Sequence, residues 1–277
     1  APIDRPLAEL AGAGLRRTED TADWRGDRLT GRRVDRLGAL VLAAFAPLVF
    51  RPSRWRITAT VAHVQQSGLN AVPIVALLTF MVGAVVAFLG ATVLEDFGAT
   101  VYTIDLVAFS FLREFGVLLA AILLAGRTAS AFTAQLGAMK SNEEIDALKT
   151  QGLDPIELLV LPRVMAMLIS LPLLAFVGML SGLVGGAMVA TLSLDISLTQ
   201  FMDTLQNDVS VTHFLVGMSK APVFAFVIAV IGCLEGFKVS GSAQSVGTHT
   251  TSSVVQSIFM VILLDALAAL FFMEMGW

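Results

Sequence analysis

The sequence contains few charged residues, and this scarcity excludes an ordinary soluble protein. Asp, Glu, Lys and Arg make up 14% of the 277 residues, whereas a soluble domain averages about 25%. Hydrophobic residues account for 56% of the chain. We therefore predict an all-α integral membrane protein.

Other features are scarce or missing. The single cysteine, Cys233, excludes an intrachain disulfide. The three histidines are scattered without ligand spacing, so no metal site is predicted. The chain opens without the pattern of a secretory signal. No glycine is followed by lysine, so the phosphate loop of an ATPase is absent. We expect a chain that is not an enzyme and binds no cofactor itself.

Positive charge is concentrated at the start of the chain. Eleven of the 18 Lys and Arg residues precede residue 57. Such a segment is typical of the cytoplasmic side of a membrane, where it meets anionic headgroups, and does not indicate nucleic-acid binding. Residues 1–33 are therefore predicted to be a basic cytoplasmic segment, although a solvated tail explains residues 1–30 equally well. Because the first residue is Ala, we expect a processed chain or part of a longer one.

Five apolar stretches are long enough to cross a bilayer, which takes about 20 residues. They cover residues 69–94, 103–126, 156–192, 212–236 and 253–275. A shorter apolar run precedes them, followed by Arg and Trp residues beside an apolar stripe, a pattern typical of a helix in the interface. Residues 34–66 are therefore predicted to form an interfacial elbow, and residues 34–277 one membrane domain.

The connections between the spans predict their orientation. Lys or Arg occurs in the connections at 127–155 and 237–252, whereas those at 95–102 and 193–211 carry acidic residues and no basic ones. Because basic loops stay in the cytoplasm, we predict a cytoplasmic N-terminus and a periplasmic C-terminus.

Two connections are predicted to contain short helices. In 193–211, apolar residues near helical spacing indicate a periplasmic surface helix able to dock a partner domain: Ile196, Phe201, Leu205 and Val209. In 141–151, Ser141 and Glu144 have the spacing of a capping box with Ser141 as N-cap. Gly152 then ends that helix, and Ile145 and Leu148 give it one apolar edge. So short a helix is marginal in water, so it must dock on the protein's own loops or on a partner subunit.

The third span carries small residues at three- and four-residue spacing: Gly178, Ser181, Gly182, Gly185, Gly186 and Ala190. Such a stripe lets two helix backbones approach closely in lipid. Packing within the chain and a seam between two copies explain it equally well.

The region from Leu112 to Leu174 resembles the signature region of the MlaE/YrbE permease family. The residues that carry the resemblance are Leu112-Arg113-Glu114, Ala125-Gly126-Arg127, the short charged helix, Pro162-Arg163, Leu171-Pro172 and, farther along, Lys220 and Asp265. The resemblance extends over about residues 34–275. Members of this family are membrane subunits of ABC transporters that move lipids between bacterial membranes.

The resemblance implies a phospholipid permease in the bacterial inner membrane. Its implied partners are a second copy of the chain, ABC ATPase subunits that bind ATP and magnesium, a periplasmic ring of MCE domains and a STAS-like regulatory subunit. It further implies that 141–151 is a coupling helix that contacts the ATPase through Ser141, Glu143, Glu144, Ile145 and Leu148. Some relatives carry a fused STAS-like domain, and residues 1–33 would then be its tail.

Four charged residues are singled out by their depth within the predicted spans: Arg113 and Glu114 midway along the second, Lys220 in the fourth and Asp265 in the fifth. A charge at the centre of a spanning helix costs about 2.5–3.5 kcal/mol. One explanation is that the four pair with one another and hold the bundle together. The other, which the resemblance favours for the first three, is a cavity in which Arg113 and Lys220 bind a lipid phosphate and Glu114 positions them. Asp265 is interpreted as mainly structural.

Large apolar residues on the first two spans are candidates for the wall of that cavity: Val85, Phe88, Leu89, Phe111 and Phe115. Taken singly, each is more simply explained by packing or by contact with lipid.

Two competing functions remain at this point. One is an ion-coupled secondary transporter with Glu114, Lys220 and Asp265 as a proton relay, although five spans do not divide into the similar halves common in that class. The other is a passive scaffold, which needs no buried charges. Co-purification of an ATPase separates the permease from both.

Overall fold

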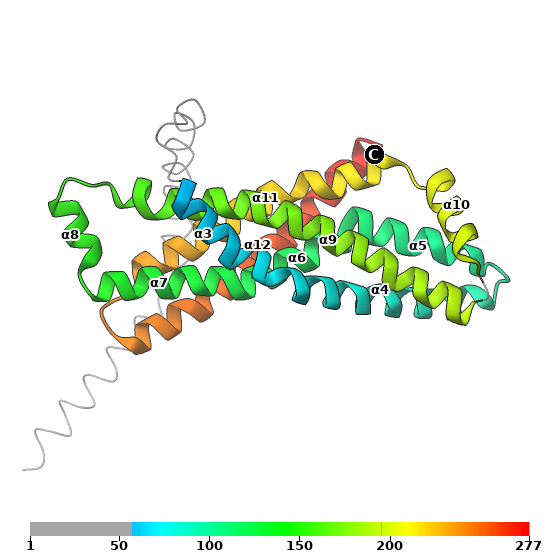
Figure 1. The fold of residues 1–277 in the computed structure, drawn as a ribbon, viewed down its shortest axis with the longest axis horizontal. Helices are drawn as coiled ribbons and strands as arrows, with labels where there is room; N and C mark the ends of the chain where they lie inside the picture. Colours follow the sequence, from blue (N-terminus) through cyan, green and yellow to red (C-terminus); the bar gives the residue numbers. More distant parts are fainter. Residues whose placement is uncertain (1–56, 195, 277) are drawn as a thin grey trace, which may run out of the picture.

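A computed structural model describes residues 57–194 and 196–276. Over these residues the chain forms an elongated bundle of long helices, with α8 (Glu144–Thr150) at one end and α10 (Leu198–Asp208) at the other (Figure 1). We refer to these as the α8 end and the α10 end. The predicted elbow at 34–66 lies outside the described residues except for its last part, which belongs to α3.

Five helical stretches of the described chain are long and apolar enough to cross a membrane, which confirms the predicted spans. The first contains α3 (Ile57–Ser67), a 3-10 turn and α4 (Val72–Glu95). The second contains α5 (Thr103–Phe109), the π-helical segment η4 (Ser110–Phe115), α6 (Gly116–Leu124), the π-helical segment η5 (Ala125–Ala129) and α7 (Ser130–Ser141). The others are η6 (Ile156–Val160) with α9 (Leu161–Ser193), α11 (Val211–Lys238) and α12 (Ala243–Glu274).

The ends of several helices follow from local chemistry. Ser197, Ser210 and Ser242 precede α10, α11 and α12, and each hydroxyl accepts a hydrogen bond from a backbone N–H in the first turn. Gly152 follows α8 with a φ of +76°, and Gly241 precedes α12 with a φ of +61°. Because of this turn and cap, α12 begins well before the apolar stretch by which the span was predicted.

α4 and α9 pack with their backbones almost in contact. A Cβ atom added to Gly185 would lie 2.0 Å from the carbonyl oxygen of Phe80. The Ser181 hydroxyl donates to the carbonyl of Ala76 across the same contact, at 2.7 Å. Other glycines of the stripe also face this chain's own atoms: Gly178, Gly182 and Gly186. The alternative of packing within the chain is confirmed.

Gly185→Ala should destabilise the bundle, because the new methyl group would collide with a backbone oxygen that cannot rotate away. Overpacking of this kind costs about 1–3 kcal/mol. Gly247→Ala in α12 is the matched control, since nothing lies within 4 Å of a Cβ added there, and Ala is favoured over Gly in a helix. Thermal unfolding in detergent should show a lower Tm for the first variant only. Equal Tm values would contradict the close contact of α4 and α9.

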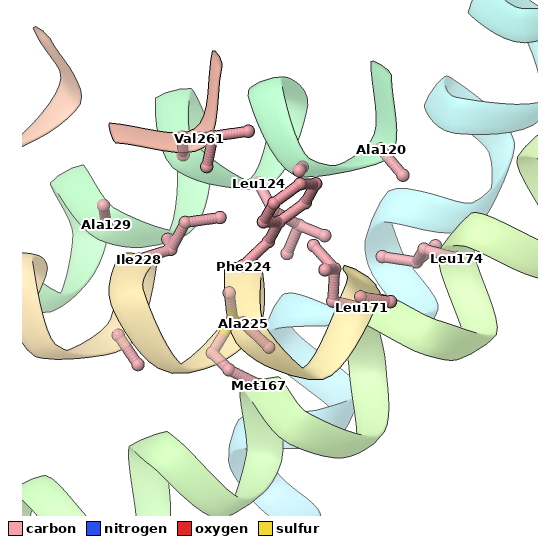
Figure 2. Close-up of a cluster of buried hydrophobic side chains, with 14 of the residues drawn as sticks. Ala120, Leu124, Ala129, Met167, Leu171, Leu174, Phe224, Ala225, Ile228 and Val261 are labelled. Carbon is pink, nitrogen blue, oxygen red and sulfur yellow. The ribbon is translucent and has the colours of Figure 1, made fainter. Parts of the chain in front are cut away.

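The centre of the bundle is filled by side chains from four helices. Figure 2 shows Phe224 of α11 among Leu124 of α6, Leu171 of α9 and Val261 of α12. All four are at most 1% exposed. This core fixes α6, α9 and α11 around the charged residues that follow.

Candidate functional site

The four charged residues predicted inside the spans meet in one network. Lys220 on α11 donates to Oε2 of Glu114 at 2.5 Å and to Oδ1 of Asp265 on α12 at 3.0 Å. Oε1 of Glu114 lies 3.7 Å from Nε of Arg113. Two positive and two negative side chains therefore balance one another, as the pairing explanation predicts.

A close helix contact brings these residues together. A Cβ atom added to Gly217, in the turn before Lys220, would lie 2.1 Å from the carbonyl oxygen of Leu112. Only glycine lets α11 approach η4 so closely. The approach also places Nζ of Lys220 3.4 Å from the carbonyl oxygen of Arg113.

Arg113 and Glu114 lie in η4, a π-helical segment that the sequence did not predict. Such segments are frequent at functional sites. Nothing in the pattern Ser110–Phe115 marks it, because the segment contains neither Gly nor Pro. Glu114 contacts Lys220 through its Oε2 atom, whereas Arg113 lies beside the Oε1 atom of the same carboxylate. This agrees with the different directions expected for side chains at adjacent helix positions.

The network is unequally buried. The side chain of Lys220 is 1% exposed and that of Asp265 is 12% exposed, whereas Arg113 and Glu114 are 20% and 26% exposed. A buried cation requires partners because desolvation is costly, and Lys220 has two carboxylates. Within the described ranges, Glu114 is the only ion-pair partner of Arg113. Among residues 57–194 and 196–276, the terminal guanidinium nitrogens of Arg113 have no ion-pair partner.

The predicted cavity wall falls into two environments. Phe111 is fully buried and packs edge-on against Phe115, with ring centroids 5.8 Å apart. Val85, Phe88 and Leu89 are 54–59% exposed on the outer face of α4. A single chain therefore does not bring the five together, and a wall built from them stays a prediction for a surface shared with a second copy.

The helix predicted at 141–151 is shorter than expected, and its predicted cap is wrong. Ser141 is the last residue of α7, and its buried hydroxyl has no hydrogen-bond partner among the described residues. α8 begins at Glu144 after Glu143, which adopts a left-handed φ of 60°. Ile145 is buried against the rest of the chain and Leu148 is half-buried, whereas Glu143 and Glu144 are exposed. The side chains of Glu143 and Glu144 are therefore accessible to a partner, whereas much of the apolar edge formed by Ile145 and Leu148 is not.

A helix is present in the connection at 193–211. Ser197 caps α10, and its hydroxyl accepts a hydrogen bond from the backbone N–H of Gln200 at 3.1 Å. Phe201 and Ile196 are buried in a small cluster with Ile104 and Ala190. The apolar edge of α10 therefore packs on its own chain.

Two further buried charged residues were not predicted from the sequence as site residues. Arg163 is 5% exposed and lies over the ring of Phe132. Its guanidinium donates to the carbonyl of Leu159 at 2.6 Å and to Oε1 of Gln135 at 3.2 Å. Glu235, near the end of α11, is 1% exposed. A carboxyl group within the apolar run that ends the fourth span is the signal that could have identified Glu235.

Comparison with known proteins identifies the family of this chain. The family described as Permease MlaE matches residues 60–271. The chain belongs to the MlaE permease family. A probable ABC transporter permease protein of Rickettsia felis is 33% identical over 229 residues, which cover 82% of this chain and 88% of that protein. The intermembrane phospholipid transport system permease protein MlaE of Haemophilus influenzae is 32% identical over 231 residues, covering 83% and 88%.

Membership of the MlaE family confirms the resemblance seen in the sequence. A third relative, a probable ABC transporter permease protein of Synechocystis sp., is 33% identical over 202 residues, or 73% of this chain and 77% of that protein. This MlaE-family chain is a multi-pass ABC transporter permease. The secondary-transporter and scaffold alternatives are therefore disfavoured.

Proposed function

We propose that this permease moves phospholipid between the inner membrane and a periplasmic carrier built from MCE domains. Separate ABC ATPase subunits drive the movement. The observation that carries the proposal is the guanidinium of Arg113 at the exposed edge of a balanced charge network within the spans. The Haemophilus influenzae relative, whose name includes phospholipid transport, supports the choice of substrate.

Arg113 is the residue best suited to hold a lipid headgroup. A guanidinium binds phosphate through two parallel hydrogen bonds. Lys220 is already engaged by Glu114 and Asp265, so its charge is largely compensated. We therefore assign phosphate binding to Arg113, and its positioning to Glu114 and Lys220.

The exposed surfaces support a proposed assembly. A second copy would cover the outer face of α4 with Val85, Phe88 and Leu89, so that acyl chains lie between the copies. The α8 end would face the cytoplasm, where Glu143 and Glu144 meet an ATPase, and the α10 end would face the periplasm. Residues 1–33 would lie in the cytoplasm beside, or as part of, a STAS-like unit.

Purification of the chain with its native partners tests the proposal. We expect native mass spectrometry to show an ATPase, two copies of this chain and bound glycerophospholipid. Arg113→Ala should reduce the retained lipid about tenfold, since hydrogen bonds to a charged group contribute about 1.5–3 kcal/mol. Arg113→Lys should restore only part of it.

Arg127→Ala is the matched control for the headgroup role. Arg127 lies farther along the same span and donates to the carbonyl of Asn70 at 2.8 Å, so this variant should retain lipid. Unchanged lipid in Arg113→Ala would refute the headgroup role. A wild-type chain that purifies without an ATPase would refute the proposed transporter as a whole.

A further inference from the structure

α12 is attached to the bundle by both apolar and polar contacts. Its buried residues are Ser253, Ser257, Val261 and Asp265, one in each successive turn. Of these four, only Val261 has a sizeable apolar side chain, although the half-buried Ile258 and Leu264 also pack against the core. Because three of the four buried residues are polar, polar contacts contribute to the position of α12.

One such contact lies at the α8 end and is made by Glu235 of α11. Its Oε2 lies 2.7 Å from Nδ1 of His249, and Nε2 of Gln256 donates to its Oε1 at 3.3 Å. Both partners are on α12. Lys238 also reaches Oε1, at 2.5 Å, but from α11 itself. A single buried carboxylate thus joins the beginning of α12 to the end of α11.

The end of α11 is in turn fixed to α7. The Thr133 hydroxyl donates to the carbonyl of Gly232 at 2.8 Å within the core. Nζ of Lys140, in the last turn of α7, donates to the carbonyl of Phe237. A Cβ atom added to Gly236 would lie 2.6 Å from Cβ of Leu136, so the two helices approach closely. α7 and α11 therefore form one unit, and α7 leads into α8 through a short turn.

The same helices carry the network within the spans. The second span holds Glu114, α11 holds Lys220 and α12 holds Asp265. α12 is one continuous helix between His249 and Asp265, a separation of roughly four turns. A displacement of its first turns is therefore carried along the helix to Asp265.

We propose that Glu235 is a positioning residue for transport, which fastens α12 to the α7–α11 unit so that movement of α8 reaches the Lys220–Asp265 pair. This inference rests on the proposed function, because it takes an ATPase at α8 as the source of movement. The Glu235 carboxylate contacts no substrate. It determines whether α12 follows the other two helices when they move.

The test uses the complete transporter in vesicles of phosphatidylethanolamine and phosphatidylglycerol, loaded with fluorescent phosphatidylglycerol. The measured quantity is labelled lipid released from the complex per ATP hydrolysed. We expect Glu235→Gln to keep ATP hydrolysis and lipid occupancy near the wild-type values while lowering release per ATP roughly tenfold, the scale set by losing a charged hydrogen bond. His249→Phe should act in the same direction.

Lys238→Met is the matched control, because Lys238 contacts the same carboxylate without crossing to another helix. It should release lipid per ATP as the wild type does. Release by Glu235→Gln equal to that of the wild type would overturn the proposal, as would an equal defect in Lys238→Met. A wild-type complex without ATP-dependent release would instead reject the proposed function, so the two failures are distinct.

A covalent substitute keeps the proposal testable if Glu235→Gln does not fold. Glu235→Cys and His249→Cys, combined with Cys233→Ala, place two thiols where the carboxylate and imidazole meet. Bridging them with a short bis-maleimide should raise release per ATP above that of the unbridged protein. Loss of release on bridging would show that α11 and α12 must separate here, and would overturn the proposal.

Discussion

Lys220→Met is expected to cause the largest loss of stability of any change in the charge network. It removes the one cation between Glu114 and Asp265 and leaves two carboxylates without it in a low-dielectric site. Breaking a buried ion pair by removing one partner costs about 3–5 kcal/mol. Thermal unfolding in detergent should show a much lower Tm, together with a poor yield of folded chain.

Neutral partners provide the control for this result. The triple variant Lys220→Met, Glu114→Gln and Asp265→Asn should recover much of the lost stability, because no carboxylate is then left without a cation, and the Arg113 that loses its partner lies at the exposed edge of the network. Arg113→Ala should lower Tm far less, since Arg113 lies at the exposed edge and Glu114 keeps Lys220. If Arg113→Ala were as damaging as Lys220→Met and were rescued by Glu114→Gln, Arg113 would be a structural ion-pair partner and its headgroup role would be refuted.

The second large effect is expected at α8. The double variant Glu143→Arg and Glu144→Arg should release the ATPase and remove lipid-stimulated ATP hydrolysis, a decrease of roughly tenfold or more if the contact is electrostatic. Both side chains are exposed, whereas Ile145 is buried, so the bundle itself should remain folded. Co-purification and ATP hydrolysis by the reconstituted complex are the measurements.

Asp203→Arg with Asp208→Arg is the matched control for α8. These two acids are also exposed on a short helix, α10, but at the opposite end of the bundle (Figure 1). This variant should retain the ATPase. Normal lipid-stimulated hydrolysis in the α8 variant would reject α8 as the coupling helix, and loss of the ATPase from both variants would show that the effect reports net charge.

The spans could be predicted because length and apolarity determine them. The side of α4 that packs into the bundle could not be predicted. α4 is apolar all round, so the sequence has no periodicity from which an inner face can be inferred. Gly83, Thr79 and Val75 face α9, whereas Val85 and Phe88 are exposed. Which large residues would line a cavity depends on that rotation, which only packing against α9 reveals.

The residues of the candidate site could be predicted from the sequence, but the ion pairs between them could not. Apolar surroundings made Arg113, Glu114, Lys220 and Asp265 conspicuous in the sequence. That Lys220 sits between two carboxylates depends on the depth at which three helices cross, and the spacing of residues along one chain does not contain that information.

The wrong cap at Ser141 has a local cause. The S-x-x-E pattern competes with the end of the preceding helix, where Ala138, Met139 and Lys140 all favour continuing the helix. Once α7 takes in Ser141, the turn must be made by Asn142 and Glu143, and Glu143 adopts the left-handed conformation. A cap motif that directly follows a strong helix-forming run is therefore weak evidence for a helix start.

The charge balance of the network also constrains the order in which the chain can be inserted into a membrane. The second span brings Arg113 and Glu114 together, and this pair is neutral by itself. α11 then adds Lys220, which pairs with Glu114, and these three residues keep one excess positive charge until α12 delivers Asp265. Because a charge in a spanning helix costs about 2.5–3.5 kcal/mol and Asp265 is one of the two carboxylates that pair with Lys220, a nascent chain that ends before α12 holds its fourth span less firmly in the bilayer. Arrival of the last helix therefore completes insertion as well as folding.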